Sequence, residues 1–194
     1  MLNLKLPTDP RWANIAEQNL DEVLIDHAFC EQKAASTAIS FIVNYPEYEE
    51  LVIAMADLVK EEMTHFQMVH NIMMERGYKM GWERKDEYVA RLKKFIPQGL
   101  DRKKALIYRL LFAAIIEARS CERFKVLSEN IKDKELSEFY FDLMKSEATH
   151  YTMFLAFARK YGVGIIDVEK VWENFLEEEK KIIADFGKKE FIHG

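Results

Sequence analysis

Acidic residues in this sequence fall on the apolar stripes of its predicted helices, where a solvated charge is not expected. Glu147 and His150 share a helical face with Leu143, Met144 and Phe154, at spacings of three, four and seven residues. An unpaired carboxylate in a protein core is costly, so a positive group has to meet it. Because no Lys or Arg lies on these stripes near the same level, a bound metal ion is the natural partner.

The same arrangement occurs twice along the chain. Glu31 precedes Glu62 by 31 residues and Glu117 precedes Glu147 by 30, and each later Glu is followed three residues on by His. Residues of a helical hairpin meet at one level when they are equally far from the turn, so the two halves bring four carboxylates and two imidazoles together. Carboxylate-rich ligation suits iron or manganese better than zinc, and two bridged metals are typical of ferritin-like bundles. The predicted ligands are Glu31, Glu62, His65, Glu117, Glu147 and His150.

Long helices are the only regular structure that the sequence predicts. The chain of 194 residues contains only 7 Gly and 4 Pro, and strand-like alternation is lacking. Breakers at Pro46, Gly77 and Gly162 separate the periodic segments. The predicted helices are 12–44, 46–77, 101–130, 133–161 and 167–185, with a short helix near 85–95. We expect one all-α domain over 1–194: a ferritin-like four-helix bundle over about 12–161, with a long crossover between its second and third helices and an extra C-terminal helix.

Composition excludes several other classes of protein. With 49% hydrophobic and 31% charged residues, the chain is neither disordered nor collagen-like. Charge interrupts each apolar run, so we expect no membrane-spanning segment, and MLNLKLPTDPRW does not resemble a secretory signal. The two cysteines form no CxxC pair, which favours a reduced, cytoplasmic protein. The net charge of −5 argues against wholesale coating of nucleic acid.

Four sequence strings resemble the MiaE family of tRNA hydroxylases. They are DHAFCEQKAAS, EEMTHF, IIEARSCERF and SEATHY, which surround the predicted ligands. The resemblance covers roughly residues 10–161. It implies a non-haem di-iron centre with two iron ions, held by the same six ligands, that uses O2 as co-substrate. It further implies a tRNA substrate, hydroxylated on the isopentenyl group of 2-methylthio-N6-isopentenyladenosine beside the anticodon.

Such a reaction needs electrons from outside this chain. Hydroxylation of an allylic C–H bond requires a redox metal and two reducing equivalents, and the sequence has no flavin or iron–sulfur motif. We therefore expect a separate reductase or a ferredoxin-like electron donor. The residue pattern leaves two alternatives open: a ferritin-like iron-storage or ferroxidase protein, and a di-iron oxygenase that acts on a small molecule.

Residues near the predicted ligands have two interpretations each. His27 lies one turn before Glu31, where it could position that carboxylate or could be a core histidine with satisfied hydrogen bonds. Cys121, one turn after Glu117, could line a cavity or could be a small buried thiol. Glu122 is an alternative ligand on the same helix, but Glu117 fits the level of the other carboxylates better.

The segment from 79 to 104 carries an excess of positive charge. It has nine basic and four acidic residues, interleaved with Trp82, Tyr88 and Phe95. Basic and aromatic side chains together suit phosphate contacts and base stacking. The alternative is a solvated connection that only crosses the bundle. The candidate tRNA contacts are Lys93, Lys94, Lys103 and Lys104.

Overall fold

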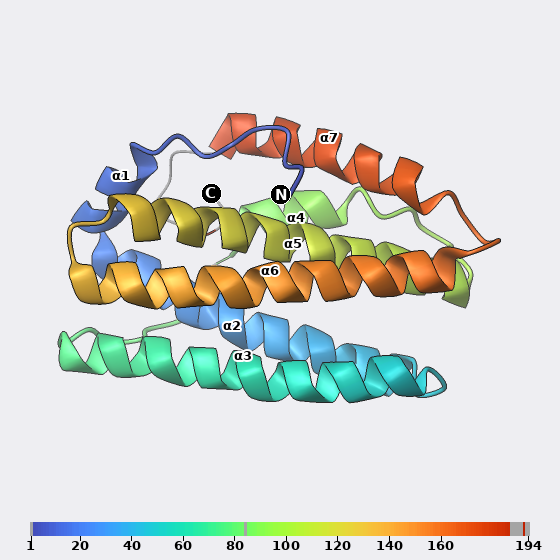
Figure 1. The fold of residues 1–194 in the computed structure, drawn as a ribbon, viewed down its shortest axis with the longest axis horizontal. Coiled ribbons are helices and arrows are strands. Elements are labelled where there is room, and N and C mark those ends of the chain that lie inside the picture. The colour runs from blue at the N-terminus through green and yellow to red at the C-terminus, as the bar shows by residue number, and fades with distance from the viewer. Residues whose placement is uncertain (1, 84, 187–191, 193–194) are drawn as a thin grey trace. The chain divides into compact units, whose positions relative to one another are not determined.

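The computed structural model describes residues 2–83, 85–186 and 192, and every regular element within them is a helix. This confirms the predicted all-α class. The helices are α1 (Trp12–Gln18), α2 (Leu20–Asn44), α3 (Glu49–Glu75), α4 (Glu87–Lys93), α5 (Arg102–Asn130), α6 (Lys134–Gly162) and α7 (Val168–Phe186) (Figure 1).

The described chain falls into two compact units. The α2/α3 unit comprises residues 18–83, 85 and 192, and the α5/α6 unit comprises residues 2–17 and 86–186. Each unit is built around one long antiparallel helical hairpin (Figure 1). The division does not test the expected single domain, which stays a prediction.

In the α2/α3 unit, a short turn reverses the chain between two helices of similar length. The Tyr45 amide donates to the Phe41 carbonyl at 2.9 Å and closes the end of α2. The predicted helix over 12–44 is wrong in one respect, because it is two helices that break at Asn19. Asn19 has φ −132° and ψ 44°, which are not helical, and Asn is poorly suited to a helix interior.

In the α5/α6 unit, acidic residues set the start of both hairpin helices. The Asp101 side chain accepts hydrogen bonds from the amides of Lys103 and Lys104 at the start of α5, at 3.1 and 3.0 Å. Asp133 accepts one from the Leu136 amide at the start of α6, at 3.2 Å. Such caps satisfy amides that have no partner inside the helix. They explain why both observed starts lie within one residue of the predicted ones.

A buried arginine joins three parts of the α5/α6 unit. Arg119 on α5 is 0% exposed; its Nε donates to Glu179 on α7 at 2.7 Å and its Nη1 to Glu122 at 2.8 Å. Its Nη2 donates to the Leu6 carbonyl at 3.0 Å. Leu6 belongs to residues 2–8, which we name the strap, and Thr8 of the strap also bonds Glu122. Arg119 therefore fixes α7 and the strap on α5.

The helices of the described residues are not of the membrane-spanning kind. None of their helices combines the length and the apolar character that crossing a bilayer requires.

Candidate metal centre

The α2/α3 unit brings three of the predicted ligands together. Glu31 on α2 faces Glu62 and His65 on α3, and these side chains are 3%, 0% and 8% exposed. The Nδ1 atom of His65 lies 3.5 Å from a Glu62 oxygen and 3.7 Å from a Glu31 oxygen. One ligand atom from each of the three residues lies within 4.8 Å of the others. We name these residues the first triad.

Hydrogen bonds shift the pKa values within the first triad. Burial raises the pKa of Glu31, but hydrogen bonds from His27 and His65 outweigh burial and hold that pKa below its usual range. Burial lowers the pKa of His65, yet the Glu31 and Glu62 carboxylates raise it to about 9. The raised pKa means that the His65 imidazole holds its proton between the Glu31 and Glu62 carboxylates. A bound cation would take the place of that proton.

The α5/α6 unit repeats the arrangement with Glu117 on α5 and Glu147 and His150 on α6. They are 6%, 3% and 2% exposed. The Nδ1 atom of His150 lies 3.8 Å from a Glu117 oxygen and 3.9 Å from a Glu147 oxygen, while its Nε2 lies 3.4 Å from the Ser146 hydroxyl. Their ligand atoms also lie within 4.8 Å of one another. We name Glu117, Glu147 and His150 the second triad.

The geometry of each triad fits a metal ion. Ligand bonds to first-row divalent metals are roughly 2.1 Å long, so two ligand atoms of one ion can be at most about 4.2 Å apart. All four histidine–carboxylate distances meet this limit, since they run from 3.5 to 3.9 Å. Two carboxylates and one imidazole form a hard donor set that suits iron or manganese.

Of His27 and Cys121, the two residues expected near the predicted ligands, only His27 has a hydrogen-bonding contact with one of them. His27 is 0% exposed, and its Nε2 lies 2.6 Å from an oxygen of Glu31. The Cys121 thiol instead donates to the backbone carbonyl of Met144 at 3.2 Å. Glu122, the rejected alternative ligand, accepts hydrogen bonds from Thr8. The distance argument that favoured Glu117 therefore selected the carboxylate that faces His150 on α6.

The predicted tRNA contacts lie around α4 and the start of α5. Lys93, Lys94 and Lys103 are exposed, while Lys104 is half-buried, with its Nζ 3.3 Å from Asp101. Lys104 is thus partly neutralised within its own helix cap. Arg84, which the basic segment also contains, lies outside the described residues. Whether these lysines bind RNA stays a prediction.

Sequence reasoning missed the buried ion pair between Arg119 and Glu179, whose Nη2 and Oε1 atoms lie 2.6 Å apart. Glu179 lies on the apolar stripe of α7 with Trp172, Phe175 and Leu176, and all four are buried. The signal is the one that identified the triads, a carboxylate on an apolar face. It was available in the sequence, but here an arginine of a neighbouring helix supplies the positive charge.

Comparisons with known proteins find sequence relatives along most of this chain. The family model described as tRNA-(MS[2]IO[6]A)-hydroxylase (MiaE) matches residues 2–194. A tRNA 2-(methylsulfanyl)-N(6)-isopentenyladenosine(37) hydroxylase of Pseudomonas putida is 39% identical over 159 residues, which cover 82% of this chain and 76% of the relative. A protein of Salmonella typhimurium with the same name is 29% identical over 206 residues, covering 81% and 75%.

A solved structure shares the fold. A Synechococcus protein with aldehyde deformylating oxygenase activity matches with a TM-score of 0.87 and 30% identity, over 98% of this chain and 95% of that chain. It is a ferritin-like di-iron protein. The match confirms the predicted ferritin-like fold, including the helices outside the two hairpins.

Proposed function

The chain belongs to the MiaE family of tRNA hydroxylases, and from this premise we propose that it hydroxylates the isopentenyl group of 2-methylthio-N6-isopentenyladenosine in tRNA. The observation that carries the proposal is the pair of matching triads, each with two buried carboxylates and one histidine. Both named relatives are tRNA hydroxylases, whereas an iron-storage protein would need no tRNA substrate. We therefore favour the hydroxylase over iron storage. Because the substrate is tRNA, we place the enzyme in the cytoplasm.

In this proposal each triad holds one iron ion, so the chain binds two. Glu31, Glu62 and His65 hold the first, and Glu117, Glu147 and His150 hold the second. When bound, the two irons supply the activation of O2 that oxidation of an unactivated C–H bond requires. That the two triads form one coupled di-iron centre, as their equal distances from the helical turns predict, also belongs to the proposal.

The protein side chains prepare and tune this site. The carboxylates of each triad are buried, so they neutralise a cation without competition from water. His27 donates to Glu31 and fixes the carboxylate that the first iron binds. Ser146 lies near the Nε2 atom of His150 and orients the imidazole so that Nδ1 faces Glu117 and Glu147.

Electrons come from a separate protein in this proposal. Each turnover needs two reducing equivalents, and the chain has only two cysteines, Cys30 and Cys121. Iron–sulfur clusters are generally held by four cysteines, so this chain has too few. A reductase or a ferredoxin-like protein is therefore the expected partner.

The lysines around α4 are the proposed tRNA contacts. An adenosine beside the anticodon lies in a single-stranded loop, where a base can be turned out without melting a duplex. The phosphates of the loop need positive charge beside them, and Lys93, Lys94 and Lys103 present exposed ammonium groups. Lys104 contributes less because of its contact with Asp101.

The test is the product of a reconstituted reaction. The iron-loaded chain, a chemical reductant, O2 and tRNA that carries the unhydroxylated base should yield a nucleoside heavier by one oxygen atom, detected by mass spectrometry. Glu62→Ala should abolish the product, while Glu61→Ala changes an exposed neighbouring carboxylate and should retain it. Unchanged tRNA with the iron-loaded parent would refute the proposed function.

A further inference from the structure

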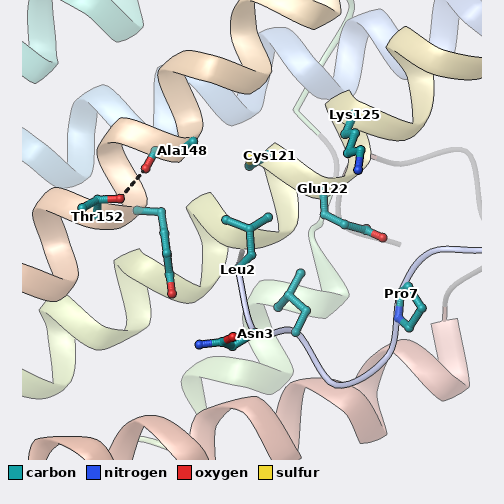
Figure 2. Close-up of a pocket in the computed structure, with 10 residues that line it drawn as sticks. Leu2, Asn3, Pro7, Cys121, Glu122, Lys125, Ala148 and Thr152 are labelled. Carbon is teal, nitrogen blue, oxygen red and sulfur yellow. Dashed lines mark hydrogen bonds between the residues drawn. The ribbon is translucent and has the colours of Figure 1, made fainter.

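A pocket of about 430 Å³ lies within the α5/α6 unit, between the strap and the helical hairpin. The strap contributes Leu2, Leu4 and Pro7 to one wall, and the helices contribute Cys121 and Ala148 to the other. Figure 2 shows Leu2 directed from the strap toward the turn of α5 that carries Cys121. This volume lies within the range of small-molecule sites.

Three polar side chains of the helical wall already have hydrogen-bond partners. The Cys121 thiol donates to the Met144 carbonyl, and the Thr152 hydroxyl donates to the Ala148 carbonyl at 2.8 Å (Figure 2). Both oxygens of Glu122 accept hydrogen bonds from Thr8. The strap leucines and Ala148 offer alkyl groups, while Asn3, Tyr151 and the exposed Lys125 also line the pocket. This lining suits a ligand that carries an apolar group beside polar ones.

The pocket shares its helix turns with the second triad. Cys121 follows Glu117 by four residues on α5, which is roughly 6 Å along a helix axis. On α6, the lining residue Tyr151 follows Glu147 by four residues, so it lies one turn further along the same face of the helix. A group bound in the pocket is thus within about one helical turn of the proposed iron ligands.

The strap is anchored to α7 and α5 through Lys5 and Leu6. Lys5 pairs with Glu173 on α7 at 2.5 Å, and Arg119 holds the Leu6 carbonyl. These contacts fix the strap over the hairpin beside the lining residues Leu2 and Leu4. The pocket is therefore a built feature of the α5/α6 unit, with one wall anchored through α7 and Arg119.

We propose that this pocket binds the alkenyl substituent of the purine substrate, so that its lining sets which substituents the enzyme accepts. The inference rests on the proposed function, because it names the subsite for the group that is oxidised. Ala148 and Cys121 are the specificity-determining residues, since their small side chains leave the space that a branched five-carbon chain fills. A larger residue at either position removes that space.

The test measures binding of a small probe separately from turnover. The probe is N6-isopentenyladenosine, titrated by calorimetry into the iron-loaded chain without O2, and adenosine is the control ligand. Ala148→Leu adds three carbons to the pocket wall, and Thr149→Leu makes a larger residue at the exposed neighbouring position. Leu4→Glu places a charge in the strap wall without touching the hairpin core, so it tests the pocket even where Ala148→Leu perturbs folding.

We expect the parent to bind the probe at least roughly tenfold more tightly than adenosine. Ala148→Leu and Leu4→Glu should each remove most of that advantage and raise the KM for tRNA, with iron content unchanged. Thr149→Leu should match the parent. Equal probe binding by the parent and both pocket variants would overturn the subsite, and so would a parent that does not distinguish the probe from adenosine.

The subsite and the proposed function fail in different ways. If the parent hydroxylates tRNA and Ala148→Leu does so with an unchanged KM and unchanged probe affinity, the pocket assignment is wrong and the function stands. If the parent binds the probe in a manner that depends on Ala148 but leaves tRNA unmodified, the subsite stands for a free alkenyl purine and the tRNA function is wrong.

Discussion

The Nε2 atom of His27 lies 2.6 Å from Oε1 of Glu31, one turn further along α2, and both side chains are buried. The second triad lacks this contact, because the residue four positions before Glu117 is Ala113. Two triads of the same ligand types therefore differ in the support of one carboxylate. This difference makes the two proposed iron sites unequal.

His27→Ala should weaken one iron site more than the other. Loss of a residue that orients a metal ligand typically lowers metal affinity by about 10- to 100-fold. We expect a titration with an iron chelator to remove one equivalent early from His27→Ala, while both are retained in the parent. Ala113→Gly, at the matching position of the second triad, is the control. Simultaneous loss of both irons would contradict the inequality of the sites.

The histidines of the triads should each be required for full iron content. Replacing His65 or His150 by Ala removes one of three proposed protein ligands, so we expect a loss of about one iron per chain, measured by elemental analysis. Helix content, measured by circular dichroism, should stay largely intact. His70→Ala is the matched control on α3, because His70 is half-buried and stacks on Phe66 at a centroid distance of 6.0 Å. Full iron occupancy in both ligand variants would remove the basis of the assignment.

The buried pair of Arg119 and Glu179 should carry a large part of the stability of the α5/α6 unit. Glu179→Leu leaves the Arg119 guanidinium without its partner on α7, which typically costs about 3–5 kcal/mol. Urea unfolding followed by circular dichroism measures this loss. The double variant Arg119→Met with Glu179→Leu should recover part of it, since no buried charge is then left unpaired. A double variant less stable than Glu179→Leu would show that Arg119 acts mainly through its bonds to the strap.

The sequence predicted the helices and the triads because both produce periodic patterns. A carboxylate on an apolar stripe is visible without coordinates, and the similar spacing between Glu31 and Glu62 and between Glu117 and Glu147 locates the residues of both triads. The break at Asn19 was missed because the apolar periodicity continues across it. The pocket could not be predicted, because its walls come from the strap and from helices more than a hundred residues further along the chain.

The two cysteines should differ in their reactivity toward alkylating reagents. Burial raises the pKa of the Cys121 thiol to about 11, and the nearby carboxylates of Glu122 and Glu117 add to this effect. Because the thiolate is the reactive form, Cys121 should be almost inert at pH 8. Cys30 is half-buried and should react first with iodoacetamide. Peptide mass spectrometry over a time course measures both rates, and equal rates would contradict the raised pKa of the Cys121 thiol.

The proposed tRNA contacts should act through charge and leave the metal site intact. Lys93, Lys94 and Lys103, changed together to Glu, should weaken tRNA binding strongly, because each lost phosphate contact removes a favourable release of counterions. Filter binding at several salt concentrations measures the affinity, and iron content should equal that of the parent.

A second set of lysines on the same unit provides the control. Lys145, Lys180 and Lys181 are exposed, and each lies within 4 Å of an acidic side chain three residues away. Changing them to Glu alters the net charge of the chain by the same amount as the first set. If both sets weaken binding equally, the effect comes from net charge and the residues around α4 are not a docking surface. A tRNA affinity lowered only by the first set places the anticodon loop beside α4 and the start of α5.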